Sequence, residues 1–92
     1  MGIFMVPATN NNIAINLAWD PNVEPEGDLA GYNLYYSTST PWGPGVAPLA
    51  NLGNVTSYSV TLPRRVYYFA LKAYDTANVE SLTFSNVVNN TL

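Results

Sequence analysis

Four carboxylates lie close together in one stretch of this sequence: Asp20, Glu24, Glu26 and Asp28. Grouped carboxylate oxygens are the ligands that Ca²⁺ prefers, and this ion accepts about six to eight oxygen atoms in irregular geometry. The stretch lacks the Asp-x-Asp-x-Asp-Gly spacing of a calcium loop. We therefore interpret it as a solvated acidic loop, with a calcium site as the alternative.

The sequence contains few residues of the types that act in catalysis. There is no His and no Cys, which excludes the Ser-His-Asp and Cys-His arrangements of nucleophilic catalysis. Glycoside hydrolysis needs two carboxyl groups about 5–10 Å apart across a substrate cleft, and we expect no such cleft beside the acidic loop of a small domain. The sequence predicts a protein that is not an enzyme and uses no cofactor.

Aromatic residues are the better candidates for a binding site. Tyr35, Tyr68 and Tyr74 alternate with apolar residues that we assign to the core, so they are expected to face outward. Trp42 lies in a Pro-Trp-Gly-Pro loop nearby. Such a patch stacks on sugar rings or anchors a protein partner. The alternative is that Trp42 folds back over the sheet and the tyrosines make ordinary cross-strand contacts.

Strands must position these side chains, and alternation of apolar and polar residues indicates where the strands lie. Residues 66–75 alternate almost perfectly and are bounded by turn residues, so they predict a central strand. Its core face would hold Tyr67, Phe69, Leu71 and Ala73. The same pattern predicts the remaining strands at 3–6, 13–19, 29–37, 46–52, 57–62 and 81–88.

Charge and hydropathy exclude several classes of partner. The chain has 92 residues, with six acidic against three basic side chains, so it lacks the positive surface that nucleic acids and anionic membranes attract. No apolar run approaches the roughly 20 residues of a transmembrane helix. The apolar N-terminal run is short and lacks the basic flank of a signal peptide. We expect neither nucleic acid nor membrane as a partner.

The strand spacing and several motifs resemble the fibronectin type III domain, an immunoglobulin-like fold. The motifs are Leu17-Ala-Trp19-Asp-Pro21, Leu29-Ala-Gly31-Tyr32-Asn-Leu34-Tyr-Tyr36, Tyr58-Ser-Val-Thr-Leu62-Pro63, and Tyr67 to Asp75 followed by Ser81 to Val88. The resemblance is to bacterial and phage-borne members. It implies an all-β, seven-stranded antiparallel Greek-key sandwich with sheets A-B-E and C'-C-F-G. The single domain would span 1–92, with an N-terminal arm or first strand over 1–12 and a polar tail over 89–92.

The resemblance also implies roles for individual residues. The core between the sheets would hold Trp19, Tyr32, Leu62, Tyr67 and Leu71. The Tyr67 hydroxyl would bond to the backbone near 63–65, as the corner tyrosine of such domains does. All the acidic residues would lie at one end of the domain and the two arginines at the other, which would suit head-to-tail contact between copies.

We expect from this sequence a structural or protein-interaction module. Because the chain begins with Met, we expect a complete small subunit or decoration protein of an extracellular assembly such as a phage virion, with a protein or copies of itself as partner. Ile3, Phe4, Met5 and Val6 would form a docking strand, and deletion of residues 1–6 would leave the fold intact and abolish assembly. The alternative is a carbohydrate-associated accessory domain of a secreted bacterial enzyme or adhesin.

Overall fold

A computed structural model describes residues 2–6, 13–22, 27–38, 42–43 and 45–90 of the chain. Short runs of alternating residues bounded by Pro, Gly and Asn give it seven strands and no helix within these ranges. The strands are β1 (Ile3–Val6), β2 (Ile13–Trp19), β3 (Leu29–Ser37), β4 (Ala47–Leu52), β5 (Ser57–Leu62), β6 (Tyr68–Asp75) and β7 (Val88–Asn89). Within the same ranges, no helix has the length and apolar character that crossing a membrane requires.

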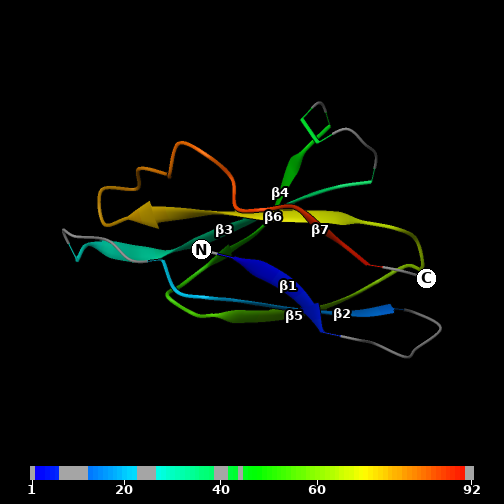
Figure 1. Cartoon of the computed structure of the whole chain (residues 1–92). Helices are drawn as coiled ribbons and strands as arrows, with labels where there is room; N and C mark the ends of the chain where they lie inside the picture. Colours follow the sequence, from blue (N-terminus) through cyan, green and yellow to red (C-terminus); the bar gives the residue numbers. More distant parts are fainter. Residues whose placement is uncertain (1, 7–12, 23–26, 39–41, 44, 91–92) are drawn as a thin grey trace.

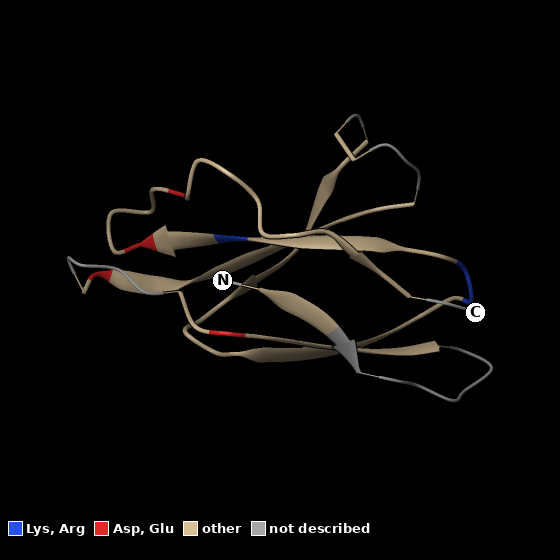
Figure 2. Ribbon diagram, viewed as in Figure 1, with Lys and Arg blue, Asp and Glu red and all other residues tan. Residues whose placement is uncertain are grey.

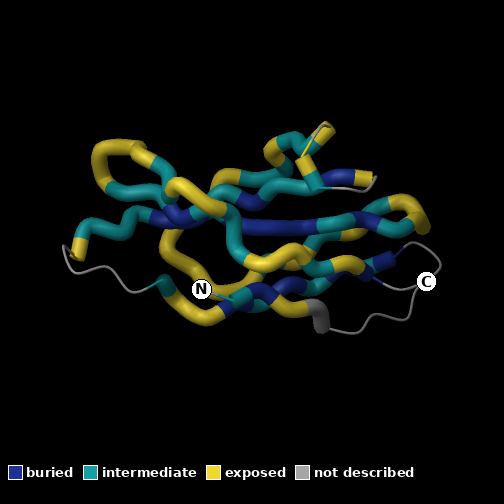
Figure 3. Tube along the Cα trace, turned by 45° about the horizontal axis from the view of Figure 1, so that its top comes forward, coloured by how far each residue is buried: buried dark blue, intermediate teal, exposed yellow. Residues whose placement is uncertain are grey.

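The strands form two antiparallel sheets (Figure 1). The three-stranded sheet has the order β1-β2-β5, and the four-stranded sheet has the order β4-β3-β6-β7. The expected all-β fold with a three-stranded and a four-stranded sheet is confirmed. Figure 3 shows that the buried stretches run along the strands of both sheets and that the exposed stretches lie mainly in the turns between them.

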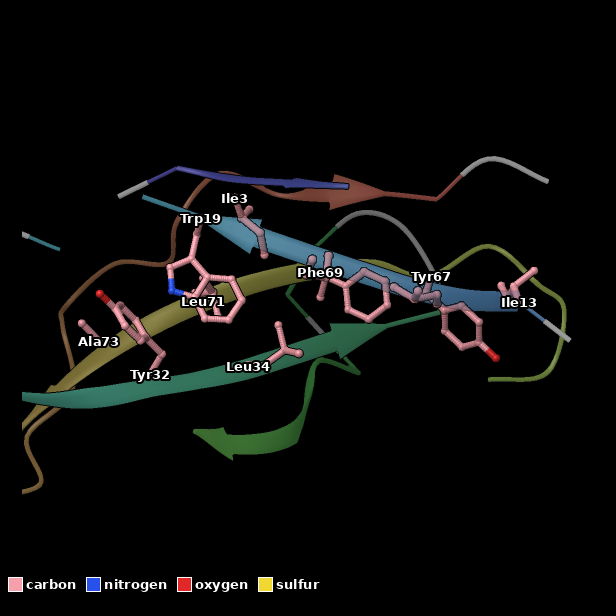
Figure 4. Close-up of a cluster of buried hydrophobic side chains, with 11 residues drawn as sticks. Ile3, Ile13, Trp19, Tyr32, Leu34, Tyr67, Phe69, Leu71 and Ala73 are labelled. Atoms are coloured by element: carbon pink, nitrogen blue, oxygen red, sulfur yellow. The ribbon is translucent and has the colours of Figure 1, made fainter. Parts of the chain in front are cut away.

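One apolar core joins the two sheets. Trp19 of β2 and Tyr32 of β3 meet across it, with ring centroids 5.5 Å apart in an edge-to-face arrangement (Figure 4). Both side chains are buried, as are Tyr67 and Leu71, whereas Leu62 is half-buried at the margin of the core. An edge-to-face pair adds about 0.5–1.5 kcal/mol to the free energy gained by burying the rings.

The central strand has the inner face that its alternation predicts. Phe69, Leu71 and Ala73 are buried, and so is Tyr67, which lies one residue before β6 begins. The Tyr67 hydroxyl donates to the Pro63 carbonyl oxygen at 2.8 Å. This hydrogen bond ties the start of β6 to the turn after β5.

The predicted last strand over 81–88 is wrong, because only Val88–Asn89 forms a strand. Ser85 N–H donates to the Leu71 carbonyl, and Ser85 Oγ accepts from Leu71 N–H, so a hydroxyl replaces a strand carbonyl. Ser81 pairs with Ala73 in the same way. Four residue steps along this segment, from 81 to 85, therefore match two along β6, from 73 to 71, and the residues between Ser81 and Ser85 leave the regular strand ladder. Figure 1 shows the segment running beside β6.

Strand β1 is an integral part of the three-stranded sheet. It pairs with β2 from Ile3 opposite Trp19 to Val6 opposite Asn16, and Ile3 is buried in the core. The Asn86 side chain accepts from Ile3 N–H and donates to Ile3 carbonyl oxygen, both at 3.0 Å, as a neighbouring strand would. Deletion of residues 1–6 would remove a paired strand and the buried Ile3 side chain, so we now expect it to destabilise the fold.

Candidate functional site

The outer face of the four-stranded sheet carries a group of aromatic residues around Phe84. The Tyr35 and Trp42 rings both meet the Phe84 ring edge to face, with centroids 5.1 and 5.3 Å away. The Lys72 Nζ lies over the same ring, 4.6 Å from its centroid. We call Tyr35, Trp42, Lys72 and Phe84 the aromatic cluster; all four side chains are half-buried.

Strand register explains why these side chains meet. Tyr35 of β3 lies opposite Ala70 of β6, and Asn33 lies opposite Lys72, so Tyr35 and Lys72 are diagonal neighbours on the outer face. The segment that follows β6 brings Phe84 back beside the sheet, and the loop after β3 brings Trp42. Ala70, although on the outer face, is fully buried, which shows that other side chains cover this part of the sheet.

A row of hydrogen-bonded polar side chains borders the aromatic cluster. Asn51 Nδ2 donates to Asn33 Oδ1 at 2.6 Å, and Asn33 Nδ2 donates to Glu80 Oε2 at 2.8 Å. The Tyr35 hydroxyl donates to the same Glu80 oxygen at 2.5 Å. We call Asn33, Asn51 and Glu80 the polar row; Tyr35 links it to the aromatic cluster.

These hydrogen bonds stabilise the ionised form of Glu80 and the neutral form of Tyr35. The bond from Tyr35 is the main cause that lowers the pKa of Glu80, followed by the bond from Asn33. The same bond to Glu80 raises the pKa of Tyr35 to about 12. At neutral pH, Glu80 is therefore an anion and Tyr35 a hydrogen-bond donor.

The structure separates the four aromatic residues that the sequence singled out. Tyr35 and Trp42 join the aromatic cluster, and Trp42 folds back onto Phe84. Tyr74 instead donates its hydroxyl to the Leu52 carbonyl oxygen at 2.8 Å and passes over Gly31. Tyr68 is half-buried opposite Ser37, and no ring contact among the described residues links it to the cluster.

Phe84, Lys72 and Glu80 are site residues that sequence reasoning missed. The alternation places Phe84 in a regular strand, and Glu80 is counted only among the acidic residues expected at one end of the domain. The signal that was available is the pair Ser81 and Ser85 flanking Phe84, because hydroxyl side chains bond to neighbouring backbone and interrupt regular strands.

The described acidic residues lie toward one end of the molecule, and the turn that carries Arg64 and Arg65 lies at the opposite end (Figure 2). Asp75 Oδ1 accepts from Ala77 N–H and Val79 N–H, both at 2.9 Å, so it closes the turn after β6. Within the described part of the chain, no three Asp, Glu, His or Cys side chains are grouped to hold a metal ion. Glu24 and Glu26 lie outside the described residues, so the calcium alternative stays a prediction.

Comparison with known proteins identifies the fold only. No protein-family model matches the sequence, and no curated protein matches it. Among solved structures, two of the Pel3 pectate lyase from Pectobacterium carotovorum match 97% and 100% of this chain, with TM-scores of 0.69 and 0.72 and sequence identities of 18% and 17%. The PelI pectate lyase from Erwinia chrysanthemi, in complex with tetragalacturonic acid, matches 96% with a TM-score of 0.69 and 15% identity. This chain covers 27% of each of those chains, so it shares the fold of about a quarter of each lyase.

Proposed function

We propose that this chain is a non-catalytic accessory module of a carbohydrate-acting protein, built as a fibronectin type III-like Greek-key β-sandwich. The observation that carries the proposal is the match of 96–100% of this chain to 27% of three pectate lyase chains. The rest of each lyase lies outside the match. The matched fold is thus one that polysaccharide-acting proteins carry beside other structure.

The outer face of the four-stranded sheet is the surface that such a module would use. The aromatic cluster offers ring surfaces on which sugar C–H groups pack, and the polar row offers amide and carboxylate groups for sugar hydroxyls. A tethered module that holds a polysaccharide raises the effective concentration of substrate near a linked enzyme without doing chemistry itself.

Affinity electrophoresis of the purified chain tests this function. Native gels would contain galactomannan, xyloglucan, mixed-linkage β-glucan or polygalacturonate, with serum albumin as the control for sieving. We expect retardation of the chain by at least one polysaccharide and no new reducing ends after long incubation. Unchanged mobility in every gel would contradict the proposal, and so would release of sugars by the chain alone.

A second candidate is a protein-interaction module of a virion or another extracellular assembly. The observation that favours it is the exposure of two apolar side chains in the segment after β6, Leu82 at 98% and Val79 at 61%. These two residues lie three positions apart in one segment, and apolar side chains that form a contiguous exposed patch mark protein contacts. Sedimentation velocity over a hundredfold concentration range tests self-association: complexes that Leu82→Ser abolishes support it, and a monomer throughout argues against copies of the chain as partner.

A further inference from the structure

We propose that the aromatic cluster and the polar row form one binding site for a neutral glycan, and that this site rejects acidic glycans such as polygalacturonate. The inference rests on the proposed carbohydrate function and narrows it to a class of ligand. The proposed ligand differs from the ligand of the PelI pectate lyase structure, because tetragalacturonic acid is itself acidic.

The apolar half of the site is held in place by contacts within the protein. Phe84 lies between Tyr35, Trp42 and Lys72, so its ring is fixed on several sides. Tyr35 and Trp42 meet this ring at nearly right angles and are half-buried, so neither residue is fully covered by the protein. Rings fixed before binding lose little side-chain entropy when a sugar packs on them.

The polar half of the site has hydrogen-bonding capacity to spare. The Glu80 carboxylate has about four acceptor positions, and the described donors, Tyr35 and Asn33, both use its Oε2 atom. Asn51 is exposed and uses its Nδ2 group toward Asn33. Among the described residues, no donor is bonded to Asn51 Oδ1, so this oxygen and Glu80 Oε1 can accept hydroxyl protons from a sugar.

The charges around the site select against acidic sugars. Glu80 is ionised at neutral pH, and a uronate carboxylate on the aromatic cluster would lie close to it. The chain has three cations in all, and two of them, Arg64 and Arg65, lie in the turn at the far end of the molecule. The third, Lys72, lies over the Phe84 ring, and its Coulombic attraction is the smallest of the causes that lower the pKa of Glu80. No second cation is thus available on this face for a uronate.

The test compares ligands that differ in charge but share a backbone. Polygalacturonate and its highly methyl-esterified form have the same sugar chain, and esterification removes the carboxylate charge. Affinity electrophoresis of the full chain at low salt would include both, together with neutral galactomannan, xyloglucan and β-glucan. We expect at least one neutral polymer to bind at least about tenfold more tightly than polygalacturonate, and the esterified form to bind better than the free acid.

Single substitutions test whether the aromatic cluster and the polar row are responsible for glycan binding and for the preference against acidic glycans. Trp42→Ala and Asn51→Ala should each weaken neutral-glycan binding several-fold, whereas Phe4→Ala, on the three-stranded sheet and 51% exposed, should leave it unchanged. Glu80→Gln should narrow the preference against polygalacturonate. Thermal melts confirm that each variant is folded before its binding is compared.

The outcomes separate this inference from the function on which it rests. Binding of polygalacturonate as tight as that of the neutral polymers overturns the neutral-glycan site and leaves the carbohydrate function standing. Neutral-glycan binding that Trp42→Ala and Asn51→Ala leave intact overturns the location of the site. Binding to no polysaccharide overturns both proposals.

Discussion

Replacing Gly31 with alanine adds one methyl group where three strands of the four-stranded sheet meet. The new Cβ would lie 2.2 Å from the Leu52 carbonyl oxygen, 2.7 Å from the Tyr74 hydroxyl and 2.9 Å from the Gly53 carbonyl carbon. Two of these three atoms belong to the backbone at the end of β4. The backbone of β3 or β4 must therefore shift to admit the methyl group, and the Tyr74 hydroxyl must move off the Leu52 carbonyl.

The expected loss combines two terms. Overpacking of a close backbone contact costs about 1–3 kcal/mol, and loss of the Tyr74 to Leu52 hydrogen bond costs about 0.5–1.5 kcal/mol. We expect Gly31→Ala to lower the free energy of unfolding by about 1.5–4.5 kcal/mol. Tyr74→Phe removes only the hydrogen bond and should cost about 1 kcal/mol.

Urea denaturation of the parent, Gly31→Ala and Tyr74→Phe measures these losses of stability, with Gly53→Ala as the matched control. An added Cβ at Gly53 meets no atom within 4 Å, so that variant should stay within about 0.5 kcal/mol of the parent. The slopes of the urea curves should agree, which shows that the change is in stability. If Gly31→Ala is as stable as Gly53→Ala, the close packing of Tyr74 over Gly31 is refuted.

Three further perturbations have expected outcomes. Trp19→Ala empties the centre of the core and should cost about 3–5 kcal/mol, measured by urea denaturation; a loss below about 1 kcal/mol would contradict the packing described. Ser85→Ala leaves Leu71 N–H without its acceptor and should lower the free energy of unfolding by about 1–3 kcal/mol. Hydrogen exchange of the Leu71 amide, measured by NMR, should become faster; an unchanged exchange rate would argue against the hydrogen bond to the Ser85 hydroxyl. Since the pKa of Glu80 is lowered on folding, its contribution to stability is present above its ordinary pKa and is lost as pH falls. Since the pKa of Tyr35 rises to about 12, its contribution is present below pH 10 and is lost between about 10 and 12. Urea midpoints of the parent and of Tyr35→Phe, measured across both pH ranges, test these two directions of change. If the midpoints of the two proteins vary with pH in the same way in both ranges, the hydrogen bond between Tyr35 and Glu80 is contradicted.

Local alternation was sufficient to predict most strands. Residues 13–19 and 68–75 have clear inner and outer faces in the sequence, and their buried faces are those that the alternation indicates. The residues over 81–85 do not reveal the irregular path, because Leu82 and Phe84 alternate with Ser81, Thr83 and Ser85 as in a strand. The hydrogen bonds that its serine hydroxyls accept from the backbone of β6, across separations of 8 and 14 residues, reveal the irregular path.

The candidate site was predicted only in part, because it depends on contacts between distant segments. Tyr35 and Trp42 were identified from residue type and position. Their partner Phe84 lies 42 residues after Trp42 and 49 residues after Tyr35 in the sequence. Tyr74 lies on the same face of the sheet as Tyr35 but does not join the aromatic cluster. Because Gly31 has no side chain, the Tyr74 hydroxyl reaches the Leu52 carbonyl oxygen and stabilises the sheet instead.

The central claim is that a glycan binds on the outer face of the four-stranded sheet, and NMR titration of the labelled chain with a neutral oligosaccharide tests it most directly. The Trp42 indole N–H is a specific probe, since Nε1 is buried without a hydrogen-bond partner among the described residues. We predict that the resonances of Trp42, Tyr35 and Phe84 shift in a saturable manner while those of the three-stranded sheet stay in place. Shifts confined to the three-stranded sheet, or no shifts with any neutral oligosaccharide that the gels identify, would contradict the claim.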